Sequence, residues 1–562
     1  MECLFSKKIM GHSIMRKIVK KHMSVEKSYK TYYDEFRKIL QKGRIIMAQN
    51  HLEEFREDLK EFHEMTRKFY NKEITVPEYK SFSGGFGSYA QRGGERSMLR
   101  LRLSGGEIDK DKLQFIVESM EKYQISMAHL TTCQTVQLHN LTEKEVCGLI
   151  EEAWEHGIIT RGGGGDFPRN VMCTPLSGVV EDETFDVLPY AKEAADYLLG
   201  FIKKVKLPRK LKVCFSNNEK NEPHATFRDL GFVAKDNHTF DVYIAGGLGN
   251  KPKFGVKVAE NVEPSKILYC IKTMVDVFTE YGNYTSRAAS RTRFLQDTLG
   301  VEGLQKVFSE KLEKNLAEEG LDISVEEVAI TKTGEKSTDE EFLGNVRVVK
   351  QKQEGLYAVS CHPIGGVIED DFFRKLYDVI ADMEEVKLRL TPDQGLYVIN
   401  LTEEEAKKVL ALTADESGTE FEKSTACIGA DICQVGIGRS QAMLAACINR
   451  VREEKLPGDA LPAIHISGCP SSCSAHQTAV IGLRGAKKQT ESGPKDAFLV
   501  MEDGCDKAGV EQFGNELGVM TVEDIPEFFA ELGKAVADKG LSYLEFRKQY
   551  PDAIAKIAEK YI

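Results

Sequence analysis

The chain has 562 residues, of which 41% are hydrophobic and 29% are charged, and these values are typical of a globular protein with about three or four domains. Its formal net charge of -11 argues against binding to nucleic acid or to an anionic membrane surface. No stretch approaches the roughly 18 apolar residues of a membrane span. An anionic substrate would therefore need a local basic patch on an acidic body.

The first 75 residues are charged, and their pattern predicts a largely helical arm with one amphipathic helix over residues 53–70. Residues 1–22 are basic but lack the continuous apolar core and the small-residue cleavage site of a secretory signal. We therefore favour an overextended N-terminus over a targeting segment. The 13 cysteines are scattered and odd in number, which does not fit a secreted disulfide framework, so we expect a cytoplasmic protein.

Two segments match without a gap at an offset of 260 residues. The run LTTCQTVQLHNLTE over residues 130–143 corresponds to LTPDQGLYVINLTE over residues 390–403, and Gly105-Gly106 corresponds to Gly365-Gly366. Chance similarity would not preserve the register over this length. The sequence therefore predicts a duplicated unit.

Each copy of this unit shows the same succession of elements. In the first copy, residues 97–103 alternate like a strand, residues 109–123 have helical periodicity, residues 136–140 form a second strand, and residues 142–154 form a helix that opens with a capping box of Thr142 and Glu145. Strand–helix–strand–helix is an α+β unit of ferredoxin-like character. We expect the half-domains 76–155 and 341–420 to pair across a pseudo-two-fold axis.

Several basic residues stand beside turn signals around and within the intervening stretch, residues 156–340. Arg100 lies on the first strand, Arg169 and Asn170 follow a glycine-rich run, and Arg209, Lys210 and Lys212 precede a strand over residues 213–216. In a strand Lys210 and Lys212 point to the same face. Taken singly, each is typical of a solvated surface charge. Only a small oxyanion or a cofactor with many carboxylates would explain gathering them.

The chain carries no nucleotide-binding module of its own. Gly246-Gly-Leu-Gly249 follows a strand over residues 240–245, but the third glycine of a dinucleotide fingerprint is missing and no helix opens after it. Any electrons that this protein uses must therefore come from another protein.

Four cysteines near the C-terminus form two unequal pairs, Cys427 with Cys433 and Cys469 with Cys473, separated by five and three residues with 35 residues between the pairs. Four thiolates suit either zinc or an iron–sulfur cluster. Zinc sites usually use Cys-x-x-Cys, which this chain lacks, so the spacing favours a cluster. The alternative is ordinary buried cysteines. We assign this segment, residues 421–562, to a separate domain.

The residues around the cysteines suggest how they are presented. Pro470 suits the first turn of a helix that would place Cys473 near free backbone N–H groups and the positive end of the helix dipole. Gly429 would let the loop between Cys427 and Cys433 bend back.

With these features placed, the sequence from about Val76 to the C-terminus resembles the sirohaem-dependent sulfite and nitrite reductases. The resemblance implies a three-domain α+β architecture with the duplicated ferredoxin-like unit, a sirohaem-binding domain over residues 156–340, and a [4Fe–4S] and sirohaem-binding domain over residues 421–562. It implies that the cluster is held by Cys427, Cys433, Cys469 and Cys473, with Cys473 also bridging to the sirohaem iron.

The resemblance also implies roles for the basic and amide residues. Arg100, Arg169, Lys210 and Lys212 would line the distal pocket, where arginines fix an oxyanion and lysines donate protons. Gln134, Asn170, Arg209 and Gln394 would contact the sirohaem. The family motif usually reads Thr-Thr-Arg-Gln where this chain has Thr131-Thr132-Cys133-Gln134. One salt bridge to the sirohaem is therefore lost or supplied elsewhere.

The function implied is six-electron reduction of sulfite to sulfide, with electrons from an external donor, naturally a ferredoxin. Reduction of nitrite to ammonia is the alternative within the family. Nitrite-preferring relatives typically have Asn at the position of Lys212, and a dianion such as sulfite gains more from the extra positive charge, so we favour sulfite. Outside the family, a non-catalytic [4Fe–4S] electron carrier or sensor and a zinc-binding structural protein are the alternatives.

Overall fold

A computed structural model describes residues 55–318, 320–326, 329–369, 371–413 and 417–562. The chain divides into two compact units, residues 1–60 and 61–562, and the sheets and the site described below lie in the second. Residues 55–70 are helical, which confirms the predicted amphipathic helix from residue 55 onward; the rest of the predicted arm up to that point, with residues 1–22, lies outside the described residues. No helix among the described residues is long and apolar enough to cross a membrane.

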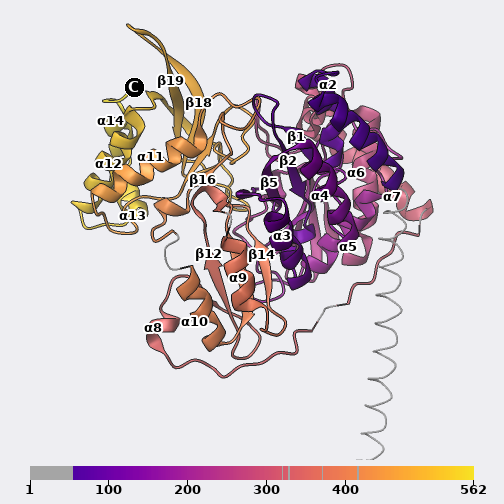
Figure 1. The fold of residues 1–562 in the computed structure, drawn as a ribbon, viewed down its shortest axis with the longest axis horizontal. Coiled ribbons are helices and arrows are strands. Elements are labelled where there is room, and N and C mark those ends of the chain that lie inside the picture. The colour runs from indigo at the N-terminus through magenta and orange to yellow at the C-terminus, as the bar shows by residue number, and fades with distance from the viewer. Residues whose placement is uncertain (1–54, 319, 327–328, 370, 414–416) are drawn as a thin grey trace, which may run out of the picture. The chain divides into compact units, whose positions relative to one another are not determined.

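The first repeat forms a five-stranded sheet in the order β1-β2-β5-β4-β13 (Figure 1). Its strands are β1 (Ser88–Ala90), β2 (Ser97–Leu101), β4 (Met127–Leu130), β5 (Val136–Leu141) and β13 (Val367–Glu369). Its helices are α2 (Val76–Ser83), α3 (Lys110–Lys122) and α4 (Glu143–Glu155). The predicted capping box is confirmed, because the Thr142 side chain accepts the Glu145 N–H and the Glu145 carboxylate accepts the Thr142 N–H.

The second repeat forms a matching sheet in the order β11-β12-β15-β14-β3. Its strands are β11 (Val348–Lys350), β12 (Tyr357–Cys361), β14 (Lys387–Leu390), β15 (Leu396–Leu401) and β3 (Glu107–Ile108), and its helices are α8 (Glu340–Leu343), α9 (Phe372–Ile380) and α10 (Glu403–Leu412). Thr402 and Glu405 form the same capping box at the start of α10. The glycines of the two copies share a left-handed backbone, with φ of 64° at Gly105 and 61° at Gly365. The predicted duplication is confirmed.

Each repeat also lends a short strand to the sheet of the other. β13 of the second repeat pairs with β4, and β3 of the first repeat pairs with β14, both antiparallel. The sequence pattern did not predict this exchange, nor did it predict β4. Because both sheets contain a strand from the other copy, the domain boundaries proposed at residues 75, 155, 340 and 420 remain predictions.

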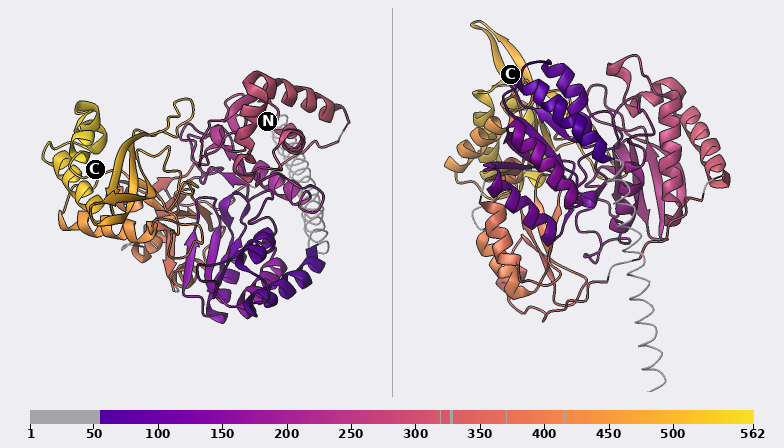
Figure 2. Two further views of the ribbon diagram at one scale, coloured as in Figure 1. Left: turned by 90° about the horizontal axis from the view of Figure 1, so that it is seen from above. Right: turned by 45° about the vertical axis from the view of Figure 1, so that its right-hand side comes forward.

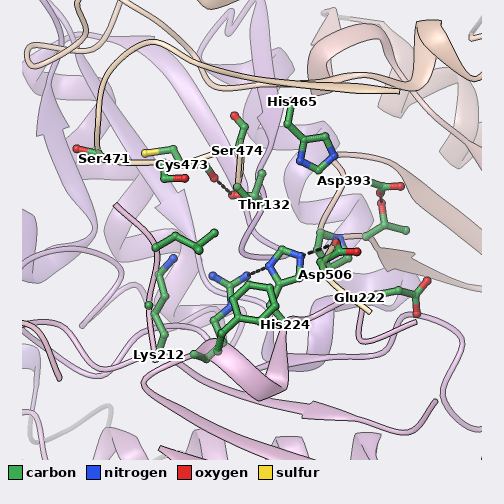
Figure 3. Close-up of a pocket in the computed structure, with 18 of the residues that line it drawn as sticks. Thr132, Lys212, Glu222, His224, Asp393, His465, Ser471, Cys473, Ser474 and Asp506 are labelled. Atoms are coloured by element: carbon green, nitrogen blue, oxygen red, sulfur yellow. Dashed lines mark hydrogen bonds and ion pairs between the residues drawn. The ribbon is translucent and has the colours of Figure 1, made fainter. Parts of the chain in front are cut away.

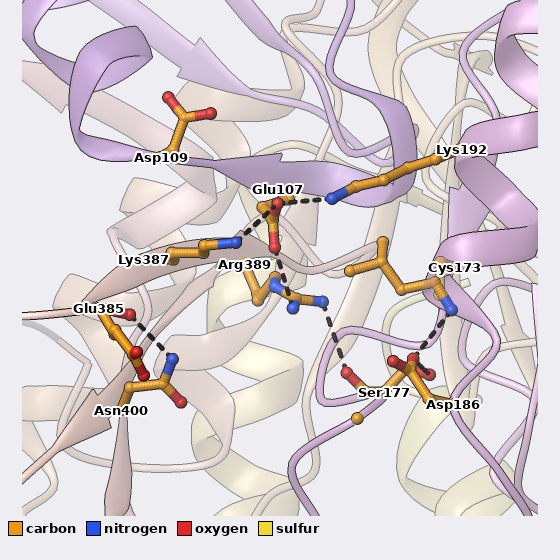
Figure 4. A network of polar contacts seen from close by, with 12 residues as sticks. Glu107, Asp109, Cys173, Ser177, Asp186, Lys192, Glu385, Lys387, Arg389 and Asn400 are labelled. Carbon is orange, nitrogen blue, oxygen red and sulfur yellow. Dashed lines mark hydrogen bonds and ion pairs between the residues drawn. The ribbon is translucent and has the colours of Figure 1, made fainter. Parts of the chain in front are cut away.

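A buried carboxylate fixes one of these two junctions (Figure 4). Glu107 on β3 lies opposite Arg389 on β14, and its oxygens lie 3.0 Å from Arg389 Nη2, 2.7 Å from Lys192 Nζ and 3.3 Å from Lys387 Nζ. Burial opposes ionisation, but the three cations together hold the pKa of Glu107 well below its ordinary value. At the equivalent junction Val367 lies opposite His129, so the two copies use different chemistry for the same pairing.

The middle of the chain forms a third sheet in the order β10-β9-β8-β7-β6, in which β6, β7 and β8 are parallel neighbours. Its core includes Phe215 stacked on Phe232, with ring centroids 4.6 Å apart. The strands are β6 (Met172–Cys173), β7 (Val213–Ser216), β8 (Leu230–Lys235), β9 (Thr239–Ile244) and β10 (Val256–Val262), and the helices are α5 (Leu188–Leu199), α6 (Ile267–Tyr281) and α7 (Leu295–Glu318), the last interrupted at Gly300.

The C-terminal segment forms a fourth sheet, in which β16, β17 and β18 are parallel neighbours and the β18–β19 hairpin extends outward (Figure 2). Both cysteine pairs follow parallel strands, and the carboxyl ends of parallel strands meet at one edge of a sheet. The strands are β16 (Thr425–Ala426), β17 (Ile464–Ser467), β18 (Ile481–Thr490), β19 (Gly493–Glu502) and β20 (Asn515–Thr521), and the helices are α11 (Ser440–Glu453), α12 (Asp524–Ala537), α13 (Tyr543–Gln549) and α14 (Ala553–Ala558).

The helix predicted to begin at Pro470 is wrong. Residues 469–478 form successive turns, and Ser472 and Ala475 have φ of 51° and 56°, which no right-handed helix accommodates. The Ser467 and Ser474 side chains explain the turns, because they bond the backbone at Ser474 and Ile466 and so compete with helical hydrogen bonds. The predicted bend at Gly429 is present, with φ of 70°.

Candidate active site

A cavity in the second unit is lined by residues from segments that lie far apart in the sequence (Figure 3). Thr132 comes from the turn between β4 and β5, and Asp393 comes from the equivalent turn of the second repeat. Lys210 and Lys212 precede β7, and Cys473 follows β17. The structure therefore brings two predicted catalytic lysines and the predicted bridging cysteine to one cavity.

Backbone pairing places Arg169 beside the two lysines. Pro168 forms a parallel bridge with Leu211, and the Arg169 N–H donates to the Leu211 carbonyl at 2.9 Å. This bridge continues into the parallel pairing of β6 with β7, so the segments that carry Arg169 and the lysines run side by side.

Arg100 and Arg169 meet at one acceptor in the glycine-rich run. Their guanidinium groups donate to the Gly163 carbonyl at 2.5 and 3.2 Å, and Arg169 also donates to the Gly165 carbonyl at 2.7 Å. Gly162 and Gly165 have φ of 72° and 64°, which favours glycine. The two arginines lie outside the cavity lining, and the charge of Arg169 acts on Lys210.

The positive groups near the cavity lower one another's pKa values. Burial lowers the pKa of Lys210 well below its ordinary value, and Arg291, Lys212 and Arg169 lower it further. Burial lowers the pKa of Arg169 to about 10. Among the described residues the Lys210 ammonium has no hydrogen-bond or ion-pair partner, so its donors remain available to an anion in the cavity.

The amides predicted to contact a cofactor are engaged with the main chain. Gln134 is fully buried, and its amide nitrogen donates to the carbonyls of Cys173 and Leu390 at 2.8 and 2.7 Å. Gln394 accepts the Ala426 N–H at 2.8 Å and donates to the Leu130 carbonyl at 3.2 Å. These bonds hold neighbouring segments together, and the predicted cofactor contacts of the two glutamines remain predictions.

Asn170 and Arg209 also have partners within the protein. The Asn170 amide nitrogen donates to the carbonyls of Leu103, Cys133 and Gln134, at 2.9, 3.0 and 3.1 Å, which holds the first-repeat turn against the segment that follows β2. Arg209 donates to Asp166 at 2.5 Å. Their predicted roles at the cofactor are likewise untested.

Three of the four cysteines, Cys427, Cys469 and Cys473, stand close enough to influence one another. Burial raises the pKa of Cys473 to about 12, Cys427 and Cys469 raise it further, and Lys210 and Lys212 lower it. Cys427 Sγ accepts the Gly468 N–H at 3.1 Å and lies 3.2 Å from Ser440 Oγ. Within the part of the chain that the structure describes, no three Cys, His, Asp or Glu side chains converge as ligands of a single metal ion.

This donor set fits an iron–sulfur cluster. Cluster ligands stand farther apart than the ligands of one ion, and N–H donors to sulfur stabilise the thiolates. Cations at the cavity, including Lys220, Arg228 and Lys507, fit a cofactor rich in carboxylates. The Cys427, Cys433, Cys469 and Cys473 thiolates would hold the cluster.

Several residues at the cavity were missed by the sequence reasoning. Thr132 Oγ1 donates to the Cys473 carbonyl at 2.7 Å, and His224 Nε2 lies 3.2 Å from Asp506 Oδ2. Arg291 pairs with Asp229 at 3.0 Å. The equivalence of the two repeat turns was the one available signal for Thr132, and isolated acids, histidines and arginines carry no spacing pattern that would have indicated the rest.

Comparison with known protein families accounts for the repeat and the middle of the chain. The pattern described as "Nitrite/Sulfite reductase ferredoxin-like half domain" matches residues 89–155 and again residues 349–415, at the same offset of 260 residues. The pattern described as "Nitrite and sulphite reductase 4Fe-4S domain" matches residues 164–316. The chain belongs to the nitrite and sulfite reductase family.

Relatives are similar over most of their length. An assimilatory ferredoxin-dependent nitrite reductase of Haloferax mediterranei is 24% identical over 84% of this chain and 86% of its own. Sulfite reductase [ferredoxin] 1 of Mycolicibacterium paratuberculosis is 24% identical over 69% of each chain. The structure of the Mycobacterium tuberculosis NirA protein superposes with a TM-score of 0.74 at 21% identity, covering 91% of this chain and 94% of that chain, which confirms the α+β fold.

Family membership confirms several predictions. The chain is an oxidoreductase, a sulfite or nitrite reductase, and the family's cofactors are sirohaem and a [4Fe–4S] cluster. The matched 4Fe-4S segment ends at residue 316, before the four cysteines. Their role as cluster ligands therefore remains a prediction.

Proposed function

We propose that the chain reduces sulfite to sulfide with six electrons from a ferredoxin-type donor, at the cavity lined by Lys210, Lys212 and Cys473. When bound, the sirohaem iron supplies the coordination site for the substrate, and the [4Fe–4S] cluster supplies electrons one at a time. The observation that carries this proposal is the convergence of cationic side chains on the cavity that Cys473 enters.

The protein's own residues would bind the oxyanion and supply protons. Arg100 and Arg169 share an acceptor at Gly163 and lie outside the cavity lining, so the direct partners of the oxyanion would be the two lysines. Lys210 and Lys212, with pKa values lowered by burial, can release a proton from Nζ to a departing oxygen, which leaves as water.

The charge of the cavity supports sulfite over nitrite. At the lysine end the charges of Arg228 and Arg291 add to those of Lys210 and Lys212, and the buried carboxylate of Asp229 is engaged by Arg291. A dianion gains more from this excess of positive charge than a monoanion does. Nitrite is the second candidate, because relatives from Haloferax mediterranei and Synechococcus elongatus are named nitrite reductases.

The test is turnover on anaerobically purified, cofactor-loaded protein with a chemical reductant, sulfite and nitrite side by side. Sulfide and ammonia are measured, and kcat/KM is compared after an absorption spectrum establishes sirohaem. We expect both products, with the higher kcat/KM for sulfite. A higher value for nitrite selects the nitrite alternative. A spectrum of the cluster alone, without turnover, would identify an electron carrier instead.

A further inference from the structure

The residue at which the sequence departs from the family motif lies against one of the proposed catalytic lysines. Lys212 Nζ donates to Cys133 Sγ at 3.3 Å. Cys133 follows Thr132, which lines the cavity, and Lys212 lines it directly. The thiol and the ammonium therefore meet at the wall of the proposed active site.

The main chain fixes both partners. The Cys133 carbonyl accepts a hydrogen bond from Asn170 at 3.0 Å, and the Cys133 N–H donates to Thr131 Oγ1 at 3.3 Å. On the other side, the Lys212 N–H donates to Asp229 at 2.8 Å. The contact is therefore set by two anchored backbones rather than by two free side chains.

No carboxylate replaces the thiol as the partner of this ammonium. The Asp229 oxygens accept from Arg291 at 3.0 and 3.1 Å, from the Thr292 hydroxyl and from the Lys212 main chain. Within the described parts of the chain, Cys133 is the one hydrogen-bond partner of the Lys212 ammonium. A half-buried ammonium beside other cations needs an anion nearby to stay charged.

We propose that Cys133 is the counter-ion of Lys212: its thiolate holds the ammonium at the cavity and keeps it protonated, which makes Cys133 a positioning residue for the reaction proposed above. The role of Cys133 in the reaction rests on the proposed function. The ion pair is inferred from the contact between Lys212 Nζ and Cys133 Sγ.

The surrounding charges agree with a thiolate. Cys133 packs against a small apolar cluster of Met172, Cys214 and Ala225, and burial opposes its ionisation. Lys212, Arg228 and Arg100 overcome this and lower the pKa of Cys133 to about 6. For Lys212, burial lowers the pKa, Cys133 raises it, and Arg228 and Arg291 lower it. Two further cations lie nearby: Lys210 is affected by the charge of Lys212, and Arg169 by the charge of Cys133.

The ion pair can be tested without any assay of activity. A thiol whose pKa is lower in the folded than in the unfolded protein stabilises the fold at pH values above the thiol's ordinary pKa. For Cys133 this stability is lost as the pH falls through about 6. Cys133→Ser in the cofactor-loaded enzyme should therefore lower the Tm more at about pH 8 than at about pH 5. In a Lys212→Gln background the extra loss at the higher pH should shrink, because only Arg228 and Arg100 then favour the thiolate. An equal loss at both pH values in the presence of Lys212 overturns the ion pair.

The positioning role is tested by nitrite binding, followed by optical titration across pH. Nitrite stays a monoanion over this range, so the profile reports the protein's own charges. Without the thiolate, Lys212 should lose its proton at a lower pH. In Cys133→Ser the pH above which nitrite binding weakens should therefore fall by about 1 unit or more. Cys133→Asp restores an anion and should return the profile towards the wild type.

The outcomes separate the two proposals. Identical shifts in Cys133→Ser and Cys133→Asp, or no shift in either, would show that Cys133 only fills space and would overturn its positioning role. If the wild-type enzyme binds neither nitrite nor sulfite, the proposed function fails, while the Tm comparison still decides whether the ion pair exists.

Discussion

The turns at residues 131–134 and 391–394 occupy equivalent places in the two repeats and share a backbone. Gln134 and Gln394 have φ of 52° and 73°, and in each turn the threonine N–H bonds the carbonyl four residues on at 3.0 Å. The first turn donates from Thr132 Oγ1 to the Cys473 carbonyl, and the second accepts the N–H of Ala426, the residue before Cys427. Duplication thus supplies two matched anchors, one for each cysteine pair.

The third residue of each turn gives the two ends of the cavity opposite electrostatics; Figure 3 shows Lys212 at one end and Asp393 with Glu222 at the other. Cys133 meets the cations Lys212, Arg228 and Arg100, which lower the pKa of its thiol against the effect of burial. Asp393 faces Glu222, and burial together with Asp393 raises the pKa of that carboxyl to about 7. The same backbone therefore presents an acid to cations in one copy and to another acid in the other.

The largest effect is expected from Cys473→Ser, which removes the proposed bridging thiolate at the end held by the first turn. Replacing residues that merely support a metal ligand costs 10–100-fold, so loss of the ligand itself should lower sulfite and nitrite turnover by more than about 100-fold. The fold should persist, because serine is close to cysteine in size and Cys473 lies at the wall of the cavity. Turnover, Tm and the absorption spectrum are measured, with Cys147→Ser on α4 as the matched control. A wild-type spectrum with full turnover contradicts the bridge.

Gln134→Ala and Gln394→Ala test whether the two turns are structurally equivalent. Each substitution leaves buried main-chain groups without partners, and we expect each to lower the free energy of unfolding by about 2 kcal/mol. Denaturation curves measure this, and sirohaem content per chain shows whether either amide also contacts the cofactor. A cost confined to one variant would break the equivalence.

Lys212→Asn changes the charge at the lysine end alone. Removing one positive charge should weaken sulfite more than nitrite, so the ratio of kcat/KM for sulfite over nitrite should fall about tenfold, equivalent to about 1.4 kcal/mol. Parallel kinetics with both anions provide the measurement. If the ratio does not move, charge is not what separates the two substrates.

Much of this arrangement follows from the sequence because the duplication is visible as a fixed offset. Two local features could be predicted because they depend only on residues close together in the sequence. These are the capping boxes at Thr142 and Thr402 and the glycine pairs at Gly105 and Gly365. The exchange of β3 and β13 was not predictable in this way, because the partner of each strand lies more than 230 residues away.

The details of the site depended on tertiary packing. The segment after Pro470 has a helical start signal, but serine side chains bond its backbone into turns. Gln134 and Gln394 were found through the repeat, yet only the structure shows that their amides bond the main chain. The contact of Cys133 with Lys212 joins residues 79 positions apart, for which the sequence holds no spacing rule.

The smallest effect, and the sharpest test of the contrast between the two turns, is expected at Glu222. A carboxyl whose pKa is raised in the folded state stabilises the protein fully below its ordinary pKa, and that stability is lost as the pH rises through about 7. Glu222→Gln should therefore raise the free energy of unfolding at about pH 8 and not at about pH 5, by about 1 kcal/mol, since the group is partly solvated.

This dependence has the opposite sign to that of Cys133→Ser, which should destabilise the protein at the higher pH. Asp393→Asn removes the neighbour that raises the pKa of Glu222 and should reproduce part of the gain. The Tm of Glu222→Gln, Asp393→Asn and Cys133→Ser, measured at both pH values, shows the sign of each pH dependence. If Glu222→Gln and Cys133→Ser change stability in the same direction as the pH rises, the two ends of the cavity are electrostatically alike, and the turns differ only in sequence.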